Sequence, residues 1–186
     1  MALAETDEAT YRHYLDTGSE ADLRVLLERH RESLTLFVNE FVRDLDDAEE
    51  VMLDAFAVVA SGTSRFDNRS SFRTWLFSIA RKLAASYLRK RRFFPEPIPD
   101  QADESLPSSD FGILREERNR TLYEALGCLA PEYRQVLFLT FFEEMDTEEV
   151  ARIMRKTPKQ VYNLTYRGKQ ALKETLERMG FSDEID

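Results

Sequence analysis

The sequence predicts an all-α protein with two small helical domains, residues 1–94 and 112–186, joined by a flexible linker over 95–111. Apolar residues recur at helical spacing through most of the 186 residues, and no segment shows the alternation of a strand bounded by hairpin turns. Four of the six prolines fall between 95 and 107 among acidic and serine residues, which is typical of an extended linker. The composition, 42% apolar and 33% charged, favours a folded chain.

Three helices are expected in the first domain. The first has a continuous apolar stripe, formed by Leu23, Leu26, Leu27, Leu34, Phe37, Val38, Phe41, Val42 and Leu45. The pattern Asp-x-x-Glu at 46–49 predicts a cap at Asp46 and a second helix through Val59. Turn-forming residues predict a loop over 61–70. A third helix begins near Ser71, and its apolar face is formed by Phe72, Trp75, Leu76, Ile79 and Leu83.

The second domain also has a helical pattern. It resumes from about Phe111, and Pro131 suits the first turn of a further helix because its missing N–H costs nothing there. The apolar positions expected in this part are Leu122, Leu126, Leu129, Val136, Leu137, Leu139 and Phe141.

Residues 146–172 have the pattern of a helix-turn-helix. Asp146 or Thr147 caps a short helix, 155–157 form the turn, and Pro158 opens a second helix that runs to about residue 178. The second helix buries Val161, Leu164 or Thr165, Gly168 and Leu172, and its outward face carries Lys159, Tyr162, Asn163, Tyr166, Arg167 and Gln170. Such an outer face suits the DNA major groove, where Asn, Gln and Arg read base edges. The same pattern also fits a helical bundle with a solvated basic face.

The composition excludes several classes of site. A single cysteine and two histidines cannot form an intramolecular disulfide or a cysteine- or histidine-rich metal site. The chain has no glycine-rich phosphate loop, no apolar run of membrane-spanning length and no signal-peptide pattern at its acidic start. We therefore expect no metal, no cofactor, no small-molecule substrate and no membrane insertion. Cys128 lies in a leucine-rich stripe, so we expect its thiol to be buried and inert.

The formal net charge of −9 argues against DNA binding, since DNA is itself a polyanion, but the charge is unevenly distributed. Residues 1–60 carry a net −10, 61–94 carry +8, 95–150 carry −10 and 151–186 carry +3. Because salt screens charges beyond about 10 Å, the two basic islands matter more to a nearby polyanion than the total charge does.

Basic and aromatic side chains alternate in the first island, at Arg65, Phe66, Arg69, Phe72, Arg73 and Trp75. Aromatic rings stack on unpaired bases for about 1–3 kcal/mol per base while cations follow the backbone, so this pattern suits single-stranded nucleic acid. The spacing of Phe72, Trp75 and Ile79 is also that of a core stripe. We expect Trp75 mainly in the core and Phe66 exposed on the loop.

These segments resemble the sigma-70 family of bacterial transcription factors, most closely its extracytoplasmic-function (ECF) type. Region 2 of that family is similar to DAEE at 47–50, AF at 55–56, RFDNRSSFRTWLFSIAR at 65–81 and RKRR at 89–92. Region 4 is similar to LAP at 129–131, QVL at 135–137, EEVA at 148–151 and the helix after Pro158. The two regions cover most of the chain, and their order, spacing and intervening linker all match.

The resemblance implies a transcription initiation factor and not an enzyme, because catalysis belongs to the polymerase. The clamp of core RNA polymerase would be bound through Asp47, Glu49, Glu50, Leu53, Asp54 and Phe56. The promoter −10 element would be recognised and melted, with its non-template strand captured, through Arg65, Phe66, Asn68, Arg69, Phe72, Arg73, Arg81, Lys82 and Arg89. Region 4 would contact the polymerase flap and bind the duplex −35 element through Lys159, Gln160, Tyr162, Asn163, Tyr166, Arg167 and Lys169.

The sequence departs from the family pattern at several of these positions. Leu53 replaces a usual glutamine of the clamp helix, Lys82 and Ser86 replace an asparagine and an aspartate, and Arg155 stands where the helix-turn-helix turn has glycine. Leu164 replaces a usually basic residue and Thr165 a usually apolar one. These departures leave the promoter preference open.

Two other functions fit parts of the pattern. A DNA-binding regulator would use the helix-turn-helix alone and would bind duplex DNA without polymerase. An acidic helical adaptor would bind proteins only. The family resemblance further implies a cytoplasmic protein, nucleoid-associated when active, which an anti-sigma factor clamping both domains restrains and can hold at the membrane.

Overall fold

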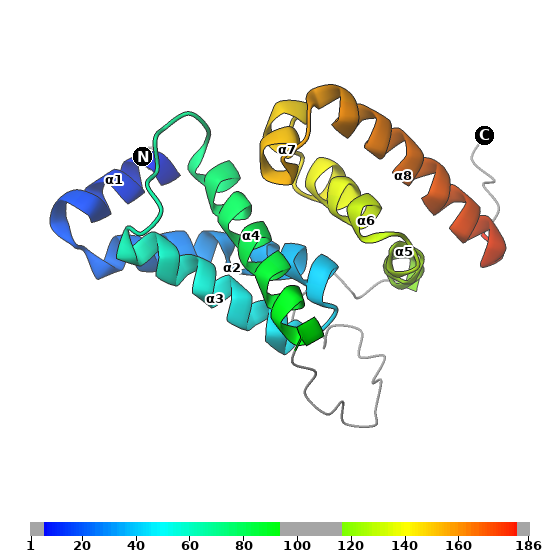
Figure 1. The fold of residues 1–186 in the computed structure, drawn as a ribbon, viewed down its shortest axis with the longest axis horizontal. Helices are drawn as coiled ribbons and strands as arrows, with labels where there is room; N and C mark the ends of the chain where they lie inside the picture. Colours follow the sequence, from blue (N-terminus) through cyan, green and yellow to red (C-terminus); the bar gives the residue numbers. More distant parts are fainter. Residues whose placement is uncertain (1–5, 94–116, 182–186) are drawn as a thin grey trace. The chain divides into compact units, whose positions relative to one another are not determined.

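The computed structural model describes residues 6–93 and 117–181, and all regular structure within these ranges is helical (Figure 1). This confirms the predicted all-α class. The predicted linker, 95–111, lies outside the described residues. Backbone contacts divide the chain into two compact units, one centred on α1–α4 and the other on α5–α8, and each is described by itself.

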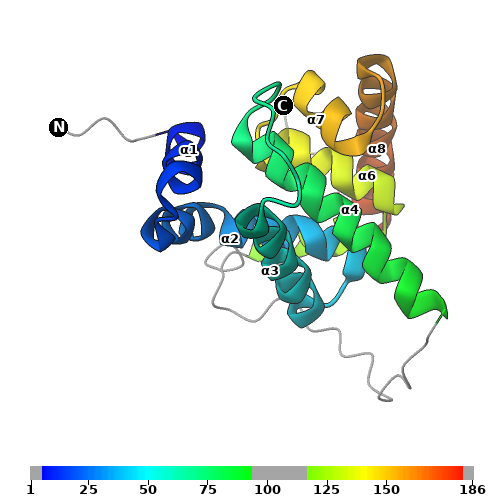
Figure 2. The same cartoon turned by 60° about the vertical axis from the view of Figure 1, so that its left-hand side comes forward.

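The first unit consists of α1 (Asp7–Thr17), α2 (Glu20–Val42), α3 (Leu45–Ser61) and α4 (Phe72–Phe93). The long helix α2 packs against both α3 and α4, which also pack against each other (Figure 2). The core comes from the apolar stripes of α2, α3 and α4 together with Tyr11 of α1, and its largest fully buried side chains are Tyr11, Leu26, Leu34, Phe37, Met52, Phe72, Leu76 and Phe77. The stripes predicted for α2, α3 and α4 therefore form one core.

The start of α3 differs from the prediction. Its N-cap is Asp44 and not Asp46, because α2 ends in a left-handed C-cap at Arg43 (φ 59°) and only Asp44 remains between the two helices. The Asp44 carboxylate accepts a hydrogen bond from the Asp47 N–H at 3.0 Å. Asp46 lies exposed in the first turn, where negative charge favours the helix dipole.

Helix α1 was not predicted. Its boundaries carry ordinary signals: the Thr6 hydroxyl accepts a hydrogen bond from the Ala9 N–H, and Gly18 ends the helix at φ 70°. Its buried contacts come mainly from tyrosines, so it lacks the aliphatic stripe by which the other helices are recognised.

A cluster of charged groups anchors α1 on α2. The Asp7 carboxylate accepts hydrogen bonds from His30 at 2.7 Å and from Arg29 at 2.9 Å. These bonds, with the one to His30 the strongest, hold the pKa of Asp7 below its ordinary value against the opposing effect of burial. The anchored position presents the inner face of α1 to the loop between α3 and α4.

The second unit contains α5 (Glu117–Gly127), α6 (Pro131–Leu137), a π-helical segment η1 (Phe138–Phe142), α7 (Thr147–Met154) and α8 (Pro158–Arg178). Helix α8 packs against α6 and α5. Pro131 and Pro158 open their helices as predicted. Two expectations were wrong: Cys128 is exposed beyond the end of α5, and Phe141 is exposed because the π-helical segment shifts the register of the apolar stripe.

A glycine lies at the crossing of α6 and α8. A Cβ on Gly168 would lie 3.3 Å from the Leu137 Cγ, so a hydrogen at this position lets the two helices approach closely. This crossing fixes which face of α8 points away from the second unit.

We predict that the Asp7 cluster stabilises the first unit in a pH-dependent way. Asp7→Asn should lower the free energy of unfolding by about 1 kcal/mol at pH 7, because it removes charge-assisted hydrogen bonds. Since the pKa of Asp7 is lowered on folding, its stabilisation is complete above the unfolded-state pKa and is lost as the pH falls through the folded-state pKa. Urea unfolding followed by fluorescence of Trp75, the one tryptophan, measures this. A wild-type advantage that persists unchanged at pH 2 would contradict the prediction.

Candidate functional site

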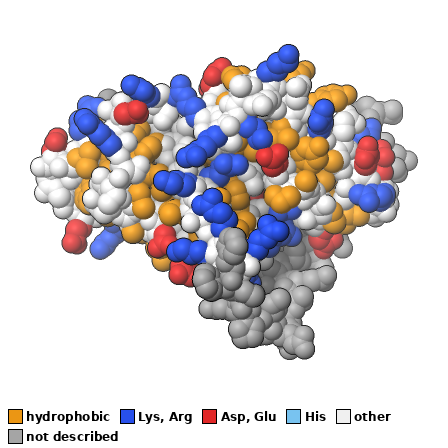
Figure 3. Space-filling model, viewed as in Figure 1, with side chains coloured by type: hydrophobic (Ala, Val, Ile, Leu, Met, Phe, Trp, Pro, Cys, Tyr) orange, Lys and Arg blue, Asp and Glu red, His pale blue; other side chains and the backbone are white. Residues whose placement is uncertain are grey.

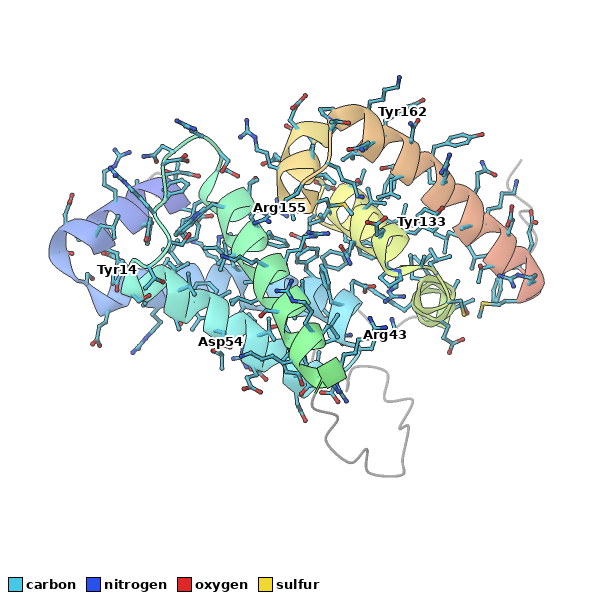
Figure 4. The ribbon with its side chains drawn as sticks, viewed as in Figure 1. Tyr14, Arg43, Asp54, Tyr133, Arg155 and Tyr162 are labelled. Atoms are coloured by element: carbon cyan, nitrogen blue, oxygen red, sulfur yellow. The ribbon has the colours of Figure 1, made fainter. Side chains whose placement is uncertain are left out.

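The outer face of α3 is a small apolar centre with an acidic border. Glu50, Leu53, Asp54 and Ala57 are all exposed, and their spacing places them on one side of the helix. Leu53 is 50% exposed at the centre. Asp54 marks this side of α3 in Figure 4. An apolar centre within a charged rim is the arrangement found in protein–protein interfaces.

Of three other residues predicted for this surface, two have carboxylates that are paired within the first unit and one is buried. The Asp47 carboxylate accepts a hydrogen bond from Arg91 of α4 at 2.8 Å, and Glu49 pairs with Arg31 of α2. Phe56 is 5% exposed in the core, so it cannot contact a partner from this conformation. It was predicted as a contact residue from the family resemblance, which does not show which neighbours cover it.

The pair between Asp47 and Arg91 has a third member. Burial, together with a hydrogen bond to Asp47, raises the pKa of Tyr87 to about 12. Asp47 therefore connects the first turn of α3 to the basic end of α4. In this arrangement it positions part of the basic surface.

The loop between α3 and α4 presents its polar side chains to solvent. Arg65, Asn68 and Arg69 are exposed, and the Arg69 side chain reaches 88%. The Asp67 carboxylate accepts the Arg69 N–H at 3.1 Å, and Asn68 takes the left-handed conformation (φ 56°) that asparagine tolerates better than most residues. The loop is thus locally ordered with its two arginines pointing outward.

The aromatic residues of this loop lie beneath its surface. Phe66 is only half-exposed, contrary to the prediction, because its ring contacts Tyr11, Phe72 and Trp75 at centroid distances of 5.2–6.1 Å. Phe72 is completely buried, so its predicted contact with DNA is not available in this structure. Trp75 was expected mainly in the core and is half-buried. Parts of Phe66 and Trp75 therefore remain accessible above a buried Phe72.

Helix α4 continues the positive surface. Lys82 and Arg89 are exposed, whereas Arg73 lies over the Phe77 ring at 5.8 Å and Arg81 over the Phe41 ring at 5.9 Å. These cation–π contacts cover aromatic rings, and both arginines remain partly exposed. Figure 3 shows Lys and Arg side chains gathered over α4.

The second unit contains the predicted helix-turn-helix. Its turn has Arg155 in the left-handed conformation (φ 54°), and the Lys156 N–H donates to the Ala151 carbonyl at 2.9 Å, as in a Schellman motif. Capping boxes formed by Asp146 with Glu149 and by Thr157 with Gln160 fix the starts of α7 and α8. The end of α7 and the start of α8, which flank the turn, are therefore both fixed by backbone and capping hydrogen bonds.

The outer face of α8 is polar and aromatic. Over 159–170 the exposed residues are Lys159, Gln160, Tyr162, Asn163, Tyr166, Arg167, Lys169 and Gln170. Tyr162 is 70% and Tyr166 61% exposed, unusually high fractions for side chains of this size (Figure 4). Gln160 uses its side-chain oxygen in the capping box, and the Lys169 ammonium lies 4.5 Å from the Phe141 ring centroid. The other predicted contact residues point outward from the helix.

Among the described residues, no group of three or more His, Cys, Asp or Glu side chains could hold a metal ion. None of the helices in 6–93 and 117–181 combines the length and hydropathy needed to cross a membrane.

The residues that support this site but were not predicted from the sequence lie in α1. Glu8, Tyr11 and Tyr14 contact the loop and its flanking helices. The Thr6 cap and Gly18 could have identified the helix. No local signal shows that its residues contact a loop more than 40 positions away.

We predict that the turn of the helix-turn-helix is strained at Arg155. Arg155→Gly should stabilise the second unit by about 0.5–1 kcal/mol, because a left-handed residue with a Cβ costs more than glycine does. Arg155→Ala, which removes the charge but keeps the Cβ, is the control and should give no gain. Hydrogen exchange of the α7 and α8 amides measures both variants. Equal protection in the two would show that the backbone conformation is not the cause.

Comparison with known proteins matches a segment of each unit to one family. The Sigma-70 region 2 family matches residues 26–94, and the Sigma-70, region 4 family matches residues 119–172. The ECF RNA polymerase sigma factor SigX of Bacillus subtilis (strain 168) is 26% identical over 166 residues, which covers 85% of each chain. The RNA polymerase sigma-H factor of Pseudomonas aeruginosa is 28% identical over 167 residues, covering 84% of this chain and 86% of its own.

Two solved structures share the fold. CnrH, in complex with the cytosolic domain of CnrY, has a TM-score of 0.68 at 20% identity and covers 92% of this chain and 97% of its own. RpoE from Bartonella quintana, in complex with the anti-sigma factor NepR, has a TM-score of 0.63 at 22% identity. It covers 84% of this chain and 97% of its own. With the two family regions matched in order along the chain, this protein belongs to the sigma-70 family of RNA polymerase sigma factors, as one of its ECF type.

Proposed function

We propose that this chain binds core RNA polymerase and directs it to promoters with particular −10 and −35 elements. The observation that carries the proposal is that one chain combines the region 2 loop, with its outward arginines, and a helix-turn-helix with an exposed outer face. The chain supplies binding energy and strand capture, and the polymerase supplies the chemistry of RNA synthesis.

The outer face of α3 is the proposed contact with the polymerase clamp. Leu53 is a large apolar side chain that is half-exposed and has acidic neighbours at Glu50 and Asp54. Burial of such a side chain in an interface removes apolar surface from water and so favours binding, and the charged rim favours a basic partner surface. Asp47 and Glu49 act indirectly, since both carboxylates are paired within the first unit.

The loop between α3 and α4 is the proposed reader of the −10 element. Arg65 and Arg69 are exposed and would bind the backbone of a displaced strand, and the exposed Lys82 and Arg89 extend the positive surface along α4. The accessible parts of Phe66 and Trp75 can stack on an extruded base, which offsets the few kcal/mol that flipping a base costs. Phe72 supports both rings from below.

Helix α8 is the proposed reader of the duplex −35 element. Asn163 and Arg167 can hydrogen-bond base edges in the major groove, and Lys159 can contact phosphate. The exposed rings of Tyr162 and Tyr166 favour apolar contact with thymine methyl groups. Gln160 and Lys169 are secondary candidates because each already has an interaction within the second unit.

The charge distribution favours promoter binding by this chain only when it is in the complex with polymerase. The acidic segments 1–60 and 95–150 give the free chain a net charge of −9, which weakens its attraction to DNA. When the polymerase covers acidic surface, the islands at 61–94 and 151–186 dominate the interaction with the promoter.

We further propose control by an anti-sigma factor. The structures of CnrH and RpoE that share this fold are complexes, the RpoE structure with an anti-sigma factor. An inhibitor that covers the exposed faces of α3 and α8 would block both the contact with core polymerase and the contact with promoter DNA. Purification of this chain from its native host tests the idea: recovery with no associated protein under non-inducing conditions would contradict it.

Run-off transcription with the cognate core polymerase tests the main function. Holoenzyme assembled from purified chain and core should produce transcripts from specific genomic promoters, and neither component alone should do so. Failure to bind core polymerase would refute the proposal. Specific binding to duplex DNA without polymerase would instead indicate a regulator that uses only the helix-turn-helix, and binding to protein but never to DNA would indicate an adaptor.

We predict that two substitutions separate the polymerase and promoter contacts. Leu53→Ser should weaken core binding about tenfold, which corresponds to about 1.4 kcal/mol. Tyr162→Ala should leave core binding unchanged and reduce transcription about tenfold at promoters that require the −35 element. Titration of labelled core polymerase and quantitative run-off assays measure the two effects.

A matched control is available for the first variant. Leu15 of α1 is 57% exposed, similar to Leu53, but lies outside the proposed interface, so Leu15→Ser should leave core binding unchanged. Equal losses for Leu15→Ser and Leu53→Ser would reject the outer face of α3 as the contact. A loss of core binding with Tyr162→Ala would show that α8 serves the polymerase and not the promoter.

A further inference from the structure

Helix α1 contacts both ends of the loop that carries the proposed −10 contacts. It lies before residue 26, where the match to region 2 begins. Its side chains reach the last turn of α3 and the first residue of α4, which are the two ends of the loop over 62–71. Figure 1 shows this loop between α3 and α4, and α1 at the N-terminal end of the same unit.

At the start of the loop, two tyrosines bind the end of α3. The Tyr11 hydroxyl donates to the Val59 carbonyl at 3.2 Å, and the Tyr14 hydroxyl donates to the Ala60 carbonyl at 2.9 Å. These carbonyls belong to the last turn of α3, beyond the reach of the regular helical hydrogen bonds, and the Val59 carbonyl also accepts the Gly62 N–H of the C-cap at 3.4 Å. Tyr14 is labelled in Figure 4 where α1 approaches this turn.

At the end of the loop, a carboxylate of α1 binds the start of α4. The Glu8 Oε1 accepts the Phe72 N–H at 2.7 Å, and the Ser71 hydroxyl accepts the Thr74 N–H at 3.1 Å. The first donors of α4 therefore have partners, and one partner comes from a residue 64 positions earlier in the chain. A negative charge at this position also favours the helix dipole.

Between these two attachments, the Tyr11 ring supports the aromatic residues of the site. It lies 5.2 Å from Phe72, 5.4 Å from Trp75 and 6.0 Å from Phe66, measured between ring centroids. Tyr11 is 2% exposed, so it cannot contact DNA itself. Its burial beneath Phe66 and Trp75 limits how far these half-exposed rings can move inward.

We propose that α1 is a positioning element for −10 recognition: Glu8, Tyr11 and Tyr14 hold the α3–α4 loop in the conformation that captures the non-template strand. This inference rests on the proposed function of the loop. A flexible loop pays a conformational entropy cost when it orders on a ligand, and attachment at both ends reduces that cost before DNA arrives. These three residues act through the loop, because their side chains are directed to its two ends and to its aromatic residues.

The test uses holoenzyme assembled with the full-length chain. The probe is a labelled single-stranded oligonucleotide that carries the non-template −10 segment of the strongest promoter transcribed by the wild-type holoenzyme. Glu8→Ala should weaken binding of this probe about tenfold, since it removes a charge-assisted hydrogen bond. Glu8→Gln keeps an acceptor oxygen and should restore most of the affinity. Asp16→Ala, which removes an exposed carboxylate from the same helix, should have no effect.

Two further measurements distinguish positioning from general destabilisation. Affinity for core polymerase should be unchanged in Glu8→Ala, and hydrogen exchange should increase in residues 62–74 but not in α2. Tyr14→Phe, which keeps the ring and removes only the bond to Ala60, should weaken probe binding in the same direction.

Wild-type affinity for the probe in Glu8→Ala and Tyr14→Phe would overturn the inference while leaving the proposed function intact. A parallel loss of core affinity and of protection throughout the first unit would also overturn it, since α1 would then serve only folding. Failure of the wild-type holoenzyme to bind the probe would instead refute the role of the loop in −10 recognition.

Discussion

The aromatic cluster around Phe72 is the contact on which the arrangement of the first unit depends. Phe72 is completely buried at the first position of α4, between Tyr11 of α1, His30 of α2 and the loop residue Phe66. A residue at a helix start can orient both the helix and the loop before it. The cluster thereby connects three helices to a ten-residue loop whose charged side chains remain exposed.

Charged groups in this protein act mainly through local pairs and not through the total charge. Asp7 attaches α1 to α2, Asp47 connects α3 to the basic end of α4, and Glu8 binds the start of α4. Each carboxylate lies in an acidic segment of the sequence and points toward a cation or an amide donor. The acidic segments therefore serve to hold basic surface in place as well as to offset its charge.

Sequence patterns predicted the local structure well where one helix supplies its own signal. The proline at the first turn, the apolar stripe and the turn residues defined α8 closely, and its outer face carries the predicted side chains. The pattern of α3 predicted the helix but not its cap at Asp44 or the burial of Phe56. Exposure depends on neighbouring helices, which a helical period does not specify.

The sequence alone determined the helical class, the helix-turn-helix and the location of both basic islands, because these follow from residue spacing and charge within one segment. Only the tertiary structure decided that Phe66 packs inward, that Asp47 pairs with Arg91 and that α1 holds the loop through Glu8. Each of these contacts joins residues from different elements. Their geometry exists only after the helices have packed, because the core, and not the local sequence, brings the partners together.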